Sequence, residues 1–260
     1  MGRRSMRVLA SAAILVIPMA QAQSTGPLAR VDVGGSYSAL SGGYSSWQSL
    51  YVRASLPDGS GANYAEAVRR MAFDQSATLV SVGRVHDLNP DWMASGFFTV
   101  SEGGDFVPYS KWDVSVTRKL LPNRSLLVTG GLSRSVNHHG YRDEAVLASV
   151  TWFPIDPWML EAGVRSNTSN PGSVSGERYW GVVGWRQAQQ REITARFETG
   201  QEGWSVLGSQ ADVVGFRSQL YNLVWSEWLG EREGVKVTVE HYDNPYYRRN
   251  TLDLAVFKQF

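Results

Sequence analysis

Apolar and polar residues alternate along much of this 260-residue chain. In the stretch VKVTV, Val235, Val237 and Val239 fall on one face of an extended strand, and Lys236 and Thr238 fall on the other. The same alternation recurs in the segments WDVSVTR (112–118), LEAGVR (160–165), EITARFE (192–198) and NTLDLAVFKQF (250–260). Few windows place apolar residues at helical spacing. The pattern predicts an all-β protein whose strands each have one apolar and one polar face.

Short segments rich in Pro, Gly, Asn and Asp separate these strands, and such residues supply turn conformations. The turn centres Pro57, Pro90, Pro122 and Ile155 lie 33, 32 and 33 residues apart, an interval that holds two strands and a loop. Longer polar stretches, such as NHHGYRDE, NTSNPGSVSGE and GQEGWSVLGSQ, lie between the short turns. We therefore expect short and long connections to alternate.

The length of the alternating runs separates two all-β architectures. Strands of a soluble two-sheet sandwich average about five or six residues, whereas the runs here are about ten residues long, the length that a tilted strand needs to cross a membrane. The sequence predicts a transmembrane up-and-down antiparallel β-barrel of about 14 strands, within a range of 12 to 16. Between Asp212 and Trp228 the parity changes, because Phe216 and Leu220 share a face with Ser218, and we expect a β-bulge there.

Tryptophan positions support a membrane barrel, because interfacial belts place indole rings near strand ends. Six lie close to the short turns and three begin strands after the longer connections: Trp92, Trp152, Trp158, Trp185, Trp225 and Trp228, then Trp47, Trp112 and Trp180. We interpret them as two girdles, one at each membrane interface.

The first 22 residues have the features of a secretory signal peptide. Arg3, Arg4 and Arg7 precede the apolar run from Val8 to Met19, and the Ala20-Gln21-Ala22 site predicts cleavage before Gln23. Residues 23–260 then form a single barrel domain. The run is too short for a transmembrane helix.

Charge and cysteine content narrow the function classes. The chain has 25 Lys plus Arg and 24 Asp plus Glu, so removal of three signal-peptide arginines leaves 22 − 24 = −2. The charges are scattered singly, which excludes a nucleic-acid partner of the basic-patch type. Because the chain contains no cysteine, it can form neither disulfides nor thiolate metal sites.

The chain ends in a strand pattern. Leu254 and Val256 share a parity with the final Phe260, while Lys258 stands where an aromatic residue is usual. A terminal aromatic residue preceded by alternating apolar residues resembles the signal that the barrel-assembly machinery recognises. We expect this strand to pair with the first strand, around 31–40, because an open sheet edge is not tolerated in hydrocarbon.

Several segments carry a family resemblance: VDVGGSYSAL, the hairpin LYVRASLPDGSG, FVPYSKWDVSVTRKLLPN and the terminal strand. Together they resemble the YaiO-type outer-membrane β-barrel family. The resemblance implies a Gram-negative outer-membrane location and a link to exopolysaccharide or glycan export. It implies no cofactor and no established activity.

The polar strand faces supply candidate lumen-lining charges, namely Asp113, Lys119, Glu161, Arg165, Glu192, Arg196, Glu198, Lys236, Glu240 and Asp253. Two interpretations remain open. The charges can pair across the barrel and fill it, or they can line a polar conduit that hydrogen-bonds sugar hydroxyls or sorts ions.

The segment YDNPYYRRN supplies candidate binding residues at the rim: Tyr242, Tyr246, Tyr247, Arg248 and Arg249. Aromatic rings stack on sugar faces, and arginine binds the phosphates of lipopolysaccharide. The same residues can equally form an interfacial girdle, and both roles bring contact with outer-membrane lipid.

The sequence does not indicate a catalytic site. Neighbouring residues of a strand point to opposite faces, so His138 and His139 would not naturally share a metal ion, and nothing marks Ser133 or Ser135 as an activated nucleophile. We predict no catalytic or metal site. The leading hypothesis is a porin-like conduit for a polar solute or glycan, together with its export partners. The alternatives are a non-conducting structural, adhesive or assembly barrel and, third, a lipid-acting enzyme that depends on His138 or His139.

Overall fold

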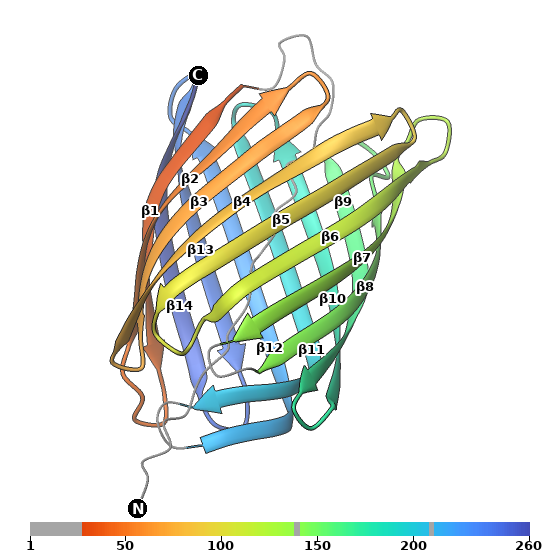
Figure 1. Ribbon diagram of the computed structural model, residues 1–260. Helices are drawn as coiled ribbons and strands as arrows, with labels where there is room; N and C mark the ends of the chain where they lie inside the picture. Colours follow the sequence, from red (N-terminus) through yellow and green to blue (C-terminus); the bar gives the residue numbers. More distant parts are fainter. Residues whose placement is uncertain (1–27, 138–140, 208–210) are drawn as a thin grey trace, which may run out of the picture.

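The computed structural model describes residues 28–137, 141–207 and 211–260, and they form one sheet (Figure 1). The predicted signal peptide and the His138-His139 pair lie outside the described residues. The strands are β1 (Arg30–Leu40), β2 (Trp47–Asp58), β3 (Gly61–Ala72), β4 (Gln75–Asn89), β5 (Trp92–Gly103), β6 (Pro108–Leu120), β7 (Leu126–Asn137), β8 (Arg142–Trp152), β9 (Trp158–Asn170), β10 (Val174–Gln187), β11 (Arg191–Leu207), β12 (Ala211–Trp228), β13 (Glu233–Asp243) and β14 (Arg248–Gln259).

The sheet closes on itself. Each strand pairs antiparallel with its sequence neighbours, and β1 pairs with β14 from Arg30↔Gln259 to Leu40↔Arg249. The prediction of an antiparallel all-β barrel of about 14 strands is confirmed, including the pairing of the last strand with the first. Within the described ranges, no helix is long and apolar enough to cross a membrane.

The two ends of the barrel differ. Both β1 and β14 have their free ends at one end, at the top in Figure 1, which we call the terminal end; the connections there span 59–60, 90–91, 121–125, 153–157, 188–190 and 229–232. At the opposite end, which we call the mouth end, long loops were expected. That expectation is wrong in detail, because β3 and β4 are joined by Phe73 and Asp74 alone, at φ 52° and 60°.

Much of the polar sequence assigned to long loops instead extends the strands. β11 and β12 contain 17 and 18 residues, and their ends turn across the barrel at the bottom of Figure 1. The predicted bulge in β12 is wrong, since its register keeps one offset against β11 from Ala211 to Glu227 and one offset against β13 from Gln219 to Trp228. Phe216 and Leu220 share the inward face with Ser218 because they pack there; the register shifts lie instead between Asp87 and Asn89 and between Pro108 and Ser110.

Contacts that skip a strand identify the inward face. Tyr51 on β2 donates a hydrogen bond of 2.7 Å to Asp253 on β14, with β1 between them. Such a contact is possible only on the concave side of the wall. Starting from this pair, the registers of the paired strands show which positions of each strand face inward. Most of the polar residues occupy these inward positions. The outward parity carries exposed valines and leucines, such as Leu50, Val146 and Val256. An apolar outer surface over a polar interior is the arrangement of a membrane barrel.

Only part of the predicted tryptophan girdle lies outside. Trp92, Trp112, Trp152, Trp158 and Trp225 face outward and are 37–45% exposed. Trp47, Trp180 and Trp228 face inward, which corrects the girdle assignment for these three residues. Trp180 Nε1 donates to Glu161 at 2.7 Å and Trp228 Nε1 to Gln259 at 3.2 Å. Proximity to a strand end does not determine which face a side chain occupies, because strand parity does.

Neighbouring residues on β6 provide a test of this inside-out arrangement. Val114 faces outward and Ser115 faces inward, where it shares a 2.7 Å hydrogen bond with Ser95. We expect Val114→Arg to lower the free energy of unfolding in lipid vesicles by about 2–4 kcal/mol, because it places a charge in hydrocarbon. Ser115→Arg should cost much less. Guanidinium unfolding followed by tryptophan fluorescence measures both, and equal losses would contradict the assigned faces.

Candidate functional site in the barrel lumen

The inner wall has two chemically distinct sectors. From β4 to β8 it is dominated at mid-height by small hydroxyl side chains, which bond across neighbouring strands. The pairs are Ser81–Thr99 at 2.8 Å, Ser95–Ser115 at 2.7 Å and Thr117–Thr129 at 2.8 Å. We call this the hydroxyl sector. These hydroxyl pairs present alternating donors and acceptors that carry no charge.

The rest of the inner wall, from β9 through β14 to β3, is the charged sector. All ten acidic and basic residues that were expected to line the lumen lie on the inward parity. Eight of them belong to this sector, whereas Asp113 and Lys119 lie on β6 in the hydroxyl sector with their partners Lys111 and Asp87. Their contacts include Lys111–Asp113 at 3.0 Å, Lys119–Asp87 at 2.6 Å, Glu161–Thr151 at 3.0 Å, Arg165–Ser133 at 2.7 Å, Arg186–Glu192 at 2.8 Å, Arg196–Glu198 at 2.8 Å, Lys236–Asp32 at 3.8 Å, Arg249–Glu240 at 2.7 Å and Tyr51–Asp253 at 2.7 Å. Each therefore has a polar partner on the wall.

These ion pairs run along the wall. They join residues on the same strand, on adjacent strands or, as for Lys236 and Asp32, on strands separated by one other. The interpretation in which the charges pair across the barrel therefore does not describe these contacts. Arg53, whose partner is Glu66 on the neighbouring strand, keeps 44% of its side chain exposed while facing inward. The charged sector thus leaves groups accessible from the lumen.

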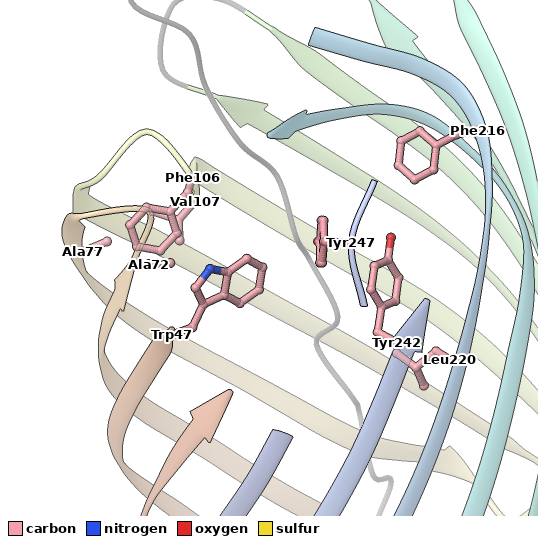
Figure 2. Close-up of a cluster of buried hydrophobic side chains, with 9 residues drawn as sticks. All are labelled: Trp47, Ala72, Ala77, Phe106, Val107, Phe216, Leu220, Tyr242 and Tyr247. Atoms are coloured by element: carbon pink, nitrogen blue, oxygen red, sulfur yellow. The ribbon is translucent and has the colours of Figure 1, made fainter. Parts of the chain in front are cut away.

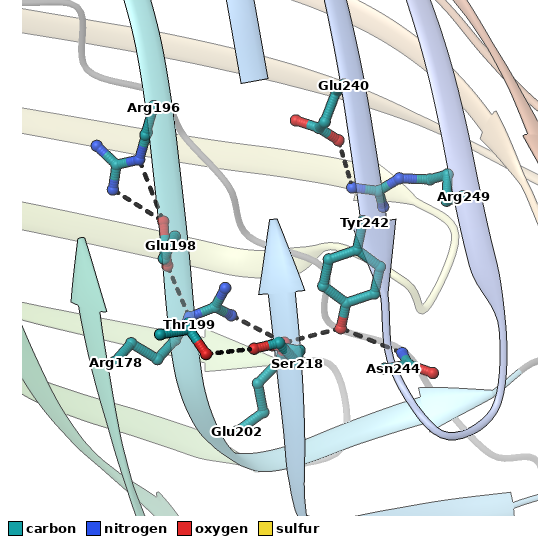
Figure 3. Close-up of polar contacts among 10 residues, drawn as sticks. All are labelled: Arg178, Arg196, Glu198, Thr199, Glu202, Ser218, Glu240, Tyr242, Asn244 and Arg249. Atoms are coloured by element: carbon teal, nitrogen blue, oxygen red, sulfur yellow. Dashed lines mark hydrogen bonds and ion pairs between the residues drawn. The ribbon is translucent and has the colours of Figure 1, made fainter. Parts of the chain in front are cut away.

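One carboxylate organises the charged sector toward the mouth end (Figure 3). Glu202 Oε1 accepts hydrogen bonds from Arg178 Nη1 at 2.8 Å, from the Tyr242 hydroxyl at 2.7 Å and from Ser218. Arg178 also contacts Glu198 at 2.6 Å. Neither Glu202 nor Arg178 was expected in the lumen. Glu202 falls in a stretch that was interpreted as a loop, and Arg178 directly follows another such stretch; the extension of β10 and β11 brings both into the lumen.

An aromatic cluster lies inside the mouth end (Figure 2). Trp47, at the start of β2, packs edge-on against Phe73 with ring centroids 5.0 Å apart and lies 6.2 Å from the ring of Tyr247. Tyr247 in turn lies 5.6 Å from Tyr242. The Arg249 guanidinium completes the group, 4.7 Å from the Trp47 ring and 5.0 Å from the Tyr242 ring. We call Trp47, Tyr242, Tyr247 and Arg249 the mouth cluster.

The mouth cluster corrects the expected rim position of three residues. Tyr242, Tyr247 and Arg249 are buried inside the barrel, whereas Tyr246 and Arg248 are exposed. Alternation along β13 and β14 places Tyr242 and Arg249 inside and Arg248 outside, since consecutive strand residues face opposite sides, while Tyr246 and Tyr247 belong to the connection between the two strands. The five residues therefore form no single binding surface.

Burial determines the protonation state of Tyr247, which lies in the connection between β13 and β14. Desolvation raises the pKa of Tyr247 to about 12, so its phenol remains a protonated, neutral hydrogen-bond donor at physiological pH. Arg249 remains charged beside Glu240. The mouth cluster thus presents aromatic faces and neutral or paired polar groups.

Two groups near the mouth cluster have no partner among the described residues. The Trp47 side chain is 8% exposed, yet its Nε1–H makes no hydrogen bond. Arg70, which faces inward on β3 opposite Ser49, makes no ion pair or hydrogen bond with a described residue, although the charges of Glu66 and Glu240 act on it. An unpaired buried donor costs about 1–3 kcal/mol. A solute rich in hydroxyl or carboxylate oxygens can therefore bind at this level of the lumen.

The serines considered as nucleophiles have structural contacts. Ser133 accepts from Arg165 at 2.7 Å, and Ser135 donates to Asp143 at 3.3 Å. Neither contact supplies a general base of the Ser–His kind. In the described part of the chain, no group of three or more acidic or histidine side chains is arranged to hold a metal ion.

The C-terminal residues lie on the outer surface. Leu254, Val256 and Phe260 are exposed and face outward, and Lys258 Nζ lies 6.0 Å from the Phe260 ring. This row faces the lipid, at the terminal end of the seam between β14 and its neighbours.

A closed 14-strand antiparallel barrel with an apolar outside and a polar lumen has the fold of the outer-membrane β-barrel class. Solved structures of this class share the fold at low sequence identity. The CymD monoaromatic hydrocarbon channel matches with a TM-score of 0.57 at 7% identity, over 90% of this chain and 88% of the other. A bacterial polysaccharide outer-membrane secretin matches at 0.56 and 9%, over 90% and 98%. Omp33 of Acinetobacter baumannii matches at 0.53 and 11%, over 90% and 99%.

The amino-acid sequence assigns the chain to one family within this fold class. The family model for the YaiO membrane β-barrel domain matches residues 29–203, and the chain belongs to this family. No curated protein matches the chain in sequence. The protein is therefore an outer-membrane β-barrel, and the usual orientation of such barrels places the terminal end in the periplasm and the mouth end outside the cell.

Glu202 should contribute measurably to stability. We expect Glu202→Ala to lower the free energy of unfolding by about 2–3 kcal/mol, because Arg178 and the Tyr242 hydroxyl lose their shared acceptor while Arg178 retains Glu198. Glu177→Ala, which removes an exposed carboxylate from the outer face of β10, should change it by no more than about 0.5 kcal/mol. Denaturant titration in detergent micelles compares the two. An equal effect would show that the Glu202 contacts do not stabilise the barrel.

Proposed function

We propose that the barrel is a conduit for a polar solute of the glycan class across the outer membrane. The observation that carries this proposal is the lateral pairing of the charged side chains in the lumen. The paired side chains contact neighbours along the wall and do not bridge the interior. The hydroxyl sector faces the charged sector and offers exchangeable hydrogen bonds to a moving solute. A conduit requires binding that is weak and distributed over many sites, and paired hydroxyls fit this requirement.

The mouth cluster supports a sugar rather than an apolar solute. Aromatic faces pack against the C–H faces of sugar rings, while the Trp47 N–H and the Arg70 guanidinium can serve sugar hydroxyls or carboxylates. The fold is shared with both a hydrocarbon channel and a polysaccharide secretin. The fold is thus compatible with transport, and the proposed solute class rests on the side chains of this lumen.

One observation favours the second candidate function, a non-conducting structural or assembly barrel. The mouth cluster is tightly packed, and Phe106 and Val107 from the β5–β6 connection pack with it as part of the same buried group (Figure 2). A permanently packed mouth would block passage. The two functions therefore predict different electrical behaviour for variants of this cluster.

Planar-bilayer recording separates the two functions. We expect the purified wild-type barrel to conduct small ions, and the Trp47→Ala/Tyr247→Ala variant to conduct several-fold more, because the substitutions remove two packed rings from the mouth. An absence of conductance in both proteins, with correct folding shown by heat-modifiable electrophoretic mobility, would reject the conduit and favour the non-conducting barrel.

Arg70 and its neighbour Arg69 form a matched pair for testing solute recognition. Arg70 faces the lumen, while Arg69 faces outward and donates to Thr78 at 3.1 Å and to Ser76 at 2.9 Å. We expect a soluble acidic oligosaccharide to block the wild-type current. Arg70→Gln should weaken this block several-fold, whereas Arg69→Gln should leave it unchanged. Equal block in all three proteins would exclude a role for Arg70.

We also propose export through the signal peptide in residues 1–22 and recognition of the outward row Leu254, Val256 and Phe260 by the barrel-assembly machinery. Amino-terminal sequencing of the protein from the outer-membrane fraction should begin at Gln23. Deletion of Phe260 should reduce the amount of assembled barrel, and unchanged assembly would contradict the second part.

A further inference from the structure

A groove crosses the outer surface of the barrel on the side opposite the hydroxyl sector. It has a volume of about 960 Å³ and runs across the outward faces of β9 to β14 and β1. Apolar side chains dominate its walls: Leu160, Val183, Phe197, Leu223, Val239 and Leu252. Gly181 and Ala195 form low points between them. Because this surface faces hydrocarbon, the groove is a place for acyl chains.

Polar residues form the edge of the groove that is nearer the mouth end. Tyr221, His241 and Asn250 lie side by side on β12, β13 and β14 and face outward. His241 Nδ1 and Asn250 Oδ1 are 2.7 Å apart, and the Tyr221 ring lies 6.3 Å from the imidazole ring. Such residues are expensive in the centre of a bilayer. Their position on three adjacent strands therefore indicates the level of lipid headgroups.

Two arginines lie beyond this edge, closer to the mouth end. Arg217 on β12 and Arg248 on β14 are exposed and face outward, and the side chain of neither makes an ion pair or hydrogen bond within the described residues. Asp243 lies between their strands, opposite both Gln219 and Arg248. Strands are about 4.8 Å apart, so Gln219 and Arg248 are separated by about 10 Å. Two cations and one carboxylate make this patch attractive to an anion.

We propose that this surface binds one phosphorylated glycolipid of the outer leaflet. The acyl chains occupy the groove, the sugar headgroup contacts Tyr221, His241 and Asn250, and a phosphate group interacts with Arg217 and Arg248. The order from apolar groove to neutral polar edge to unpaired guanidinium groups matches the order of chemical groups along such a lipid. The site lies outside the lumen and does not depend on conduction.

Native mass spectrometry of the full-length barrel tests the proposal. The probes are a short-chain lipopolysaccharide, the same lipid after removal of its phosphates, and phosphatidylglycerol. We expect the wild type to retain the first probe, and to retain the dephosphorylated lipid and phosphatidylglycerol about tenfold less, because the arginines select phosphate and the headgroup edge selects sugar.

Two variants separate the headgroup from the acyl groove. Arg217→Ala/Arg248→Ala should reduce retention of the phosphorylated probe about tenfold. Gly181→Leu should also reduce it by filling the groove without changing charge, and a Cβ at Gly181 meets nothing closer than the Glu161 carbonyl oxygen at 3.9 Å. The matched control, Arg134→Ala/Arg142→Ala, removes two outward arginines from β7 and β8, away from the groove, and should retain lipid like the wild type.

Three results would overturn the proposal. The first is unchanged retention in both the arginine variant and Gly181→Leu. The second is an equal loss in the Arg134→Ala/Arg142→Ala control, which would reflect general charge. The third is a lipid-free dimer lost in Gly181→Leu, which would assign the groove to a second copy of the chain. Circular dichroism and heat-modifiable mobility confirm that each variant is folded.

Discussion

The backbone hydrogen bonds between β1 and β14 are the contacts on which the rest of the structure depends. An unpaired N–H or C=O group in hydrocarbon costs several kcal/mol, so an open sheet of these 14 strands would expose two expensive edges. Closure removes both edges, from Arg30↔Gln259 to Leu40↔Arg249. It also fixes the chemistry of the two faces, because a closed wall in a membrane has lipid on one side and the lumen on the other. The even number of antiparallel strands places the free ends of both terminal strands at one end of the barrel.

Because the sheet is closed, the specific side-chain contacts of this protein are concentrated in the lumen and not in an apolar core. Inward residues cannot contact lipid, so the chain can afford many charges there provided that each has a partner. Arg178, Glu198 and Glu202 satisfy one another on adjacent strands, and Tyr242 joins them from β13. Pairs of this kind need only neighbouring strands to be in register, which the backbone ladder already ensures. The barrel therefore acquires a polar interior without the long-range packing that a soluble domain needs.

The sequence predicted the strand type, the closure and the face of the lumen charges for one reason: alternation with a period of two is a local property that tertiary contacts rarely override here. The sequence-based predictions were wrong where the position of a side chain depends on something other than this period of two. Trp228 ends β12 and Trp180 lies midway along β10, yet the parity of both residues points them to partners inside the barrel, Gln259 and Glu161. Phe216 and Leu220 suggested a bulge because an inward apolar residue was not expected, although the mouth end packs several. Glu202 was missed because polar residues beyond the membrane look the same in a loop and in an extended strand.

The segment YDNPYYRRN illustrates how one sequence cluster becomes two sites. Its tyrosines and arginines occur as adjacent pairs, and adjacent positions on a strand face opposite sides. Arg249 thus contributes to the mouth cluster through Glu240 and Trp47, while Arg248 faces the outer leaflet. On β13, Tyr242 faces Glu202 in the lumen and its neighbour His241 faces Asn250 outside. The barrel wall is a single layer of strands. Neighbouring residues of one strand therefore face the lumen and the lipid in turn. A substitution that changes one of these contacts without shifting the backbone should therefore leave the other intact.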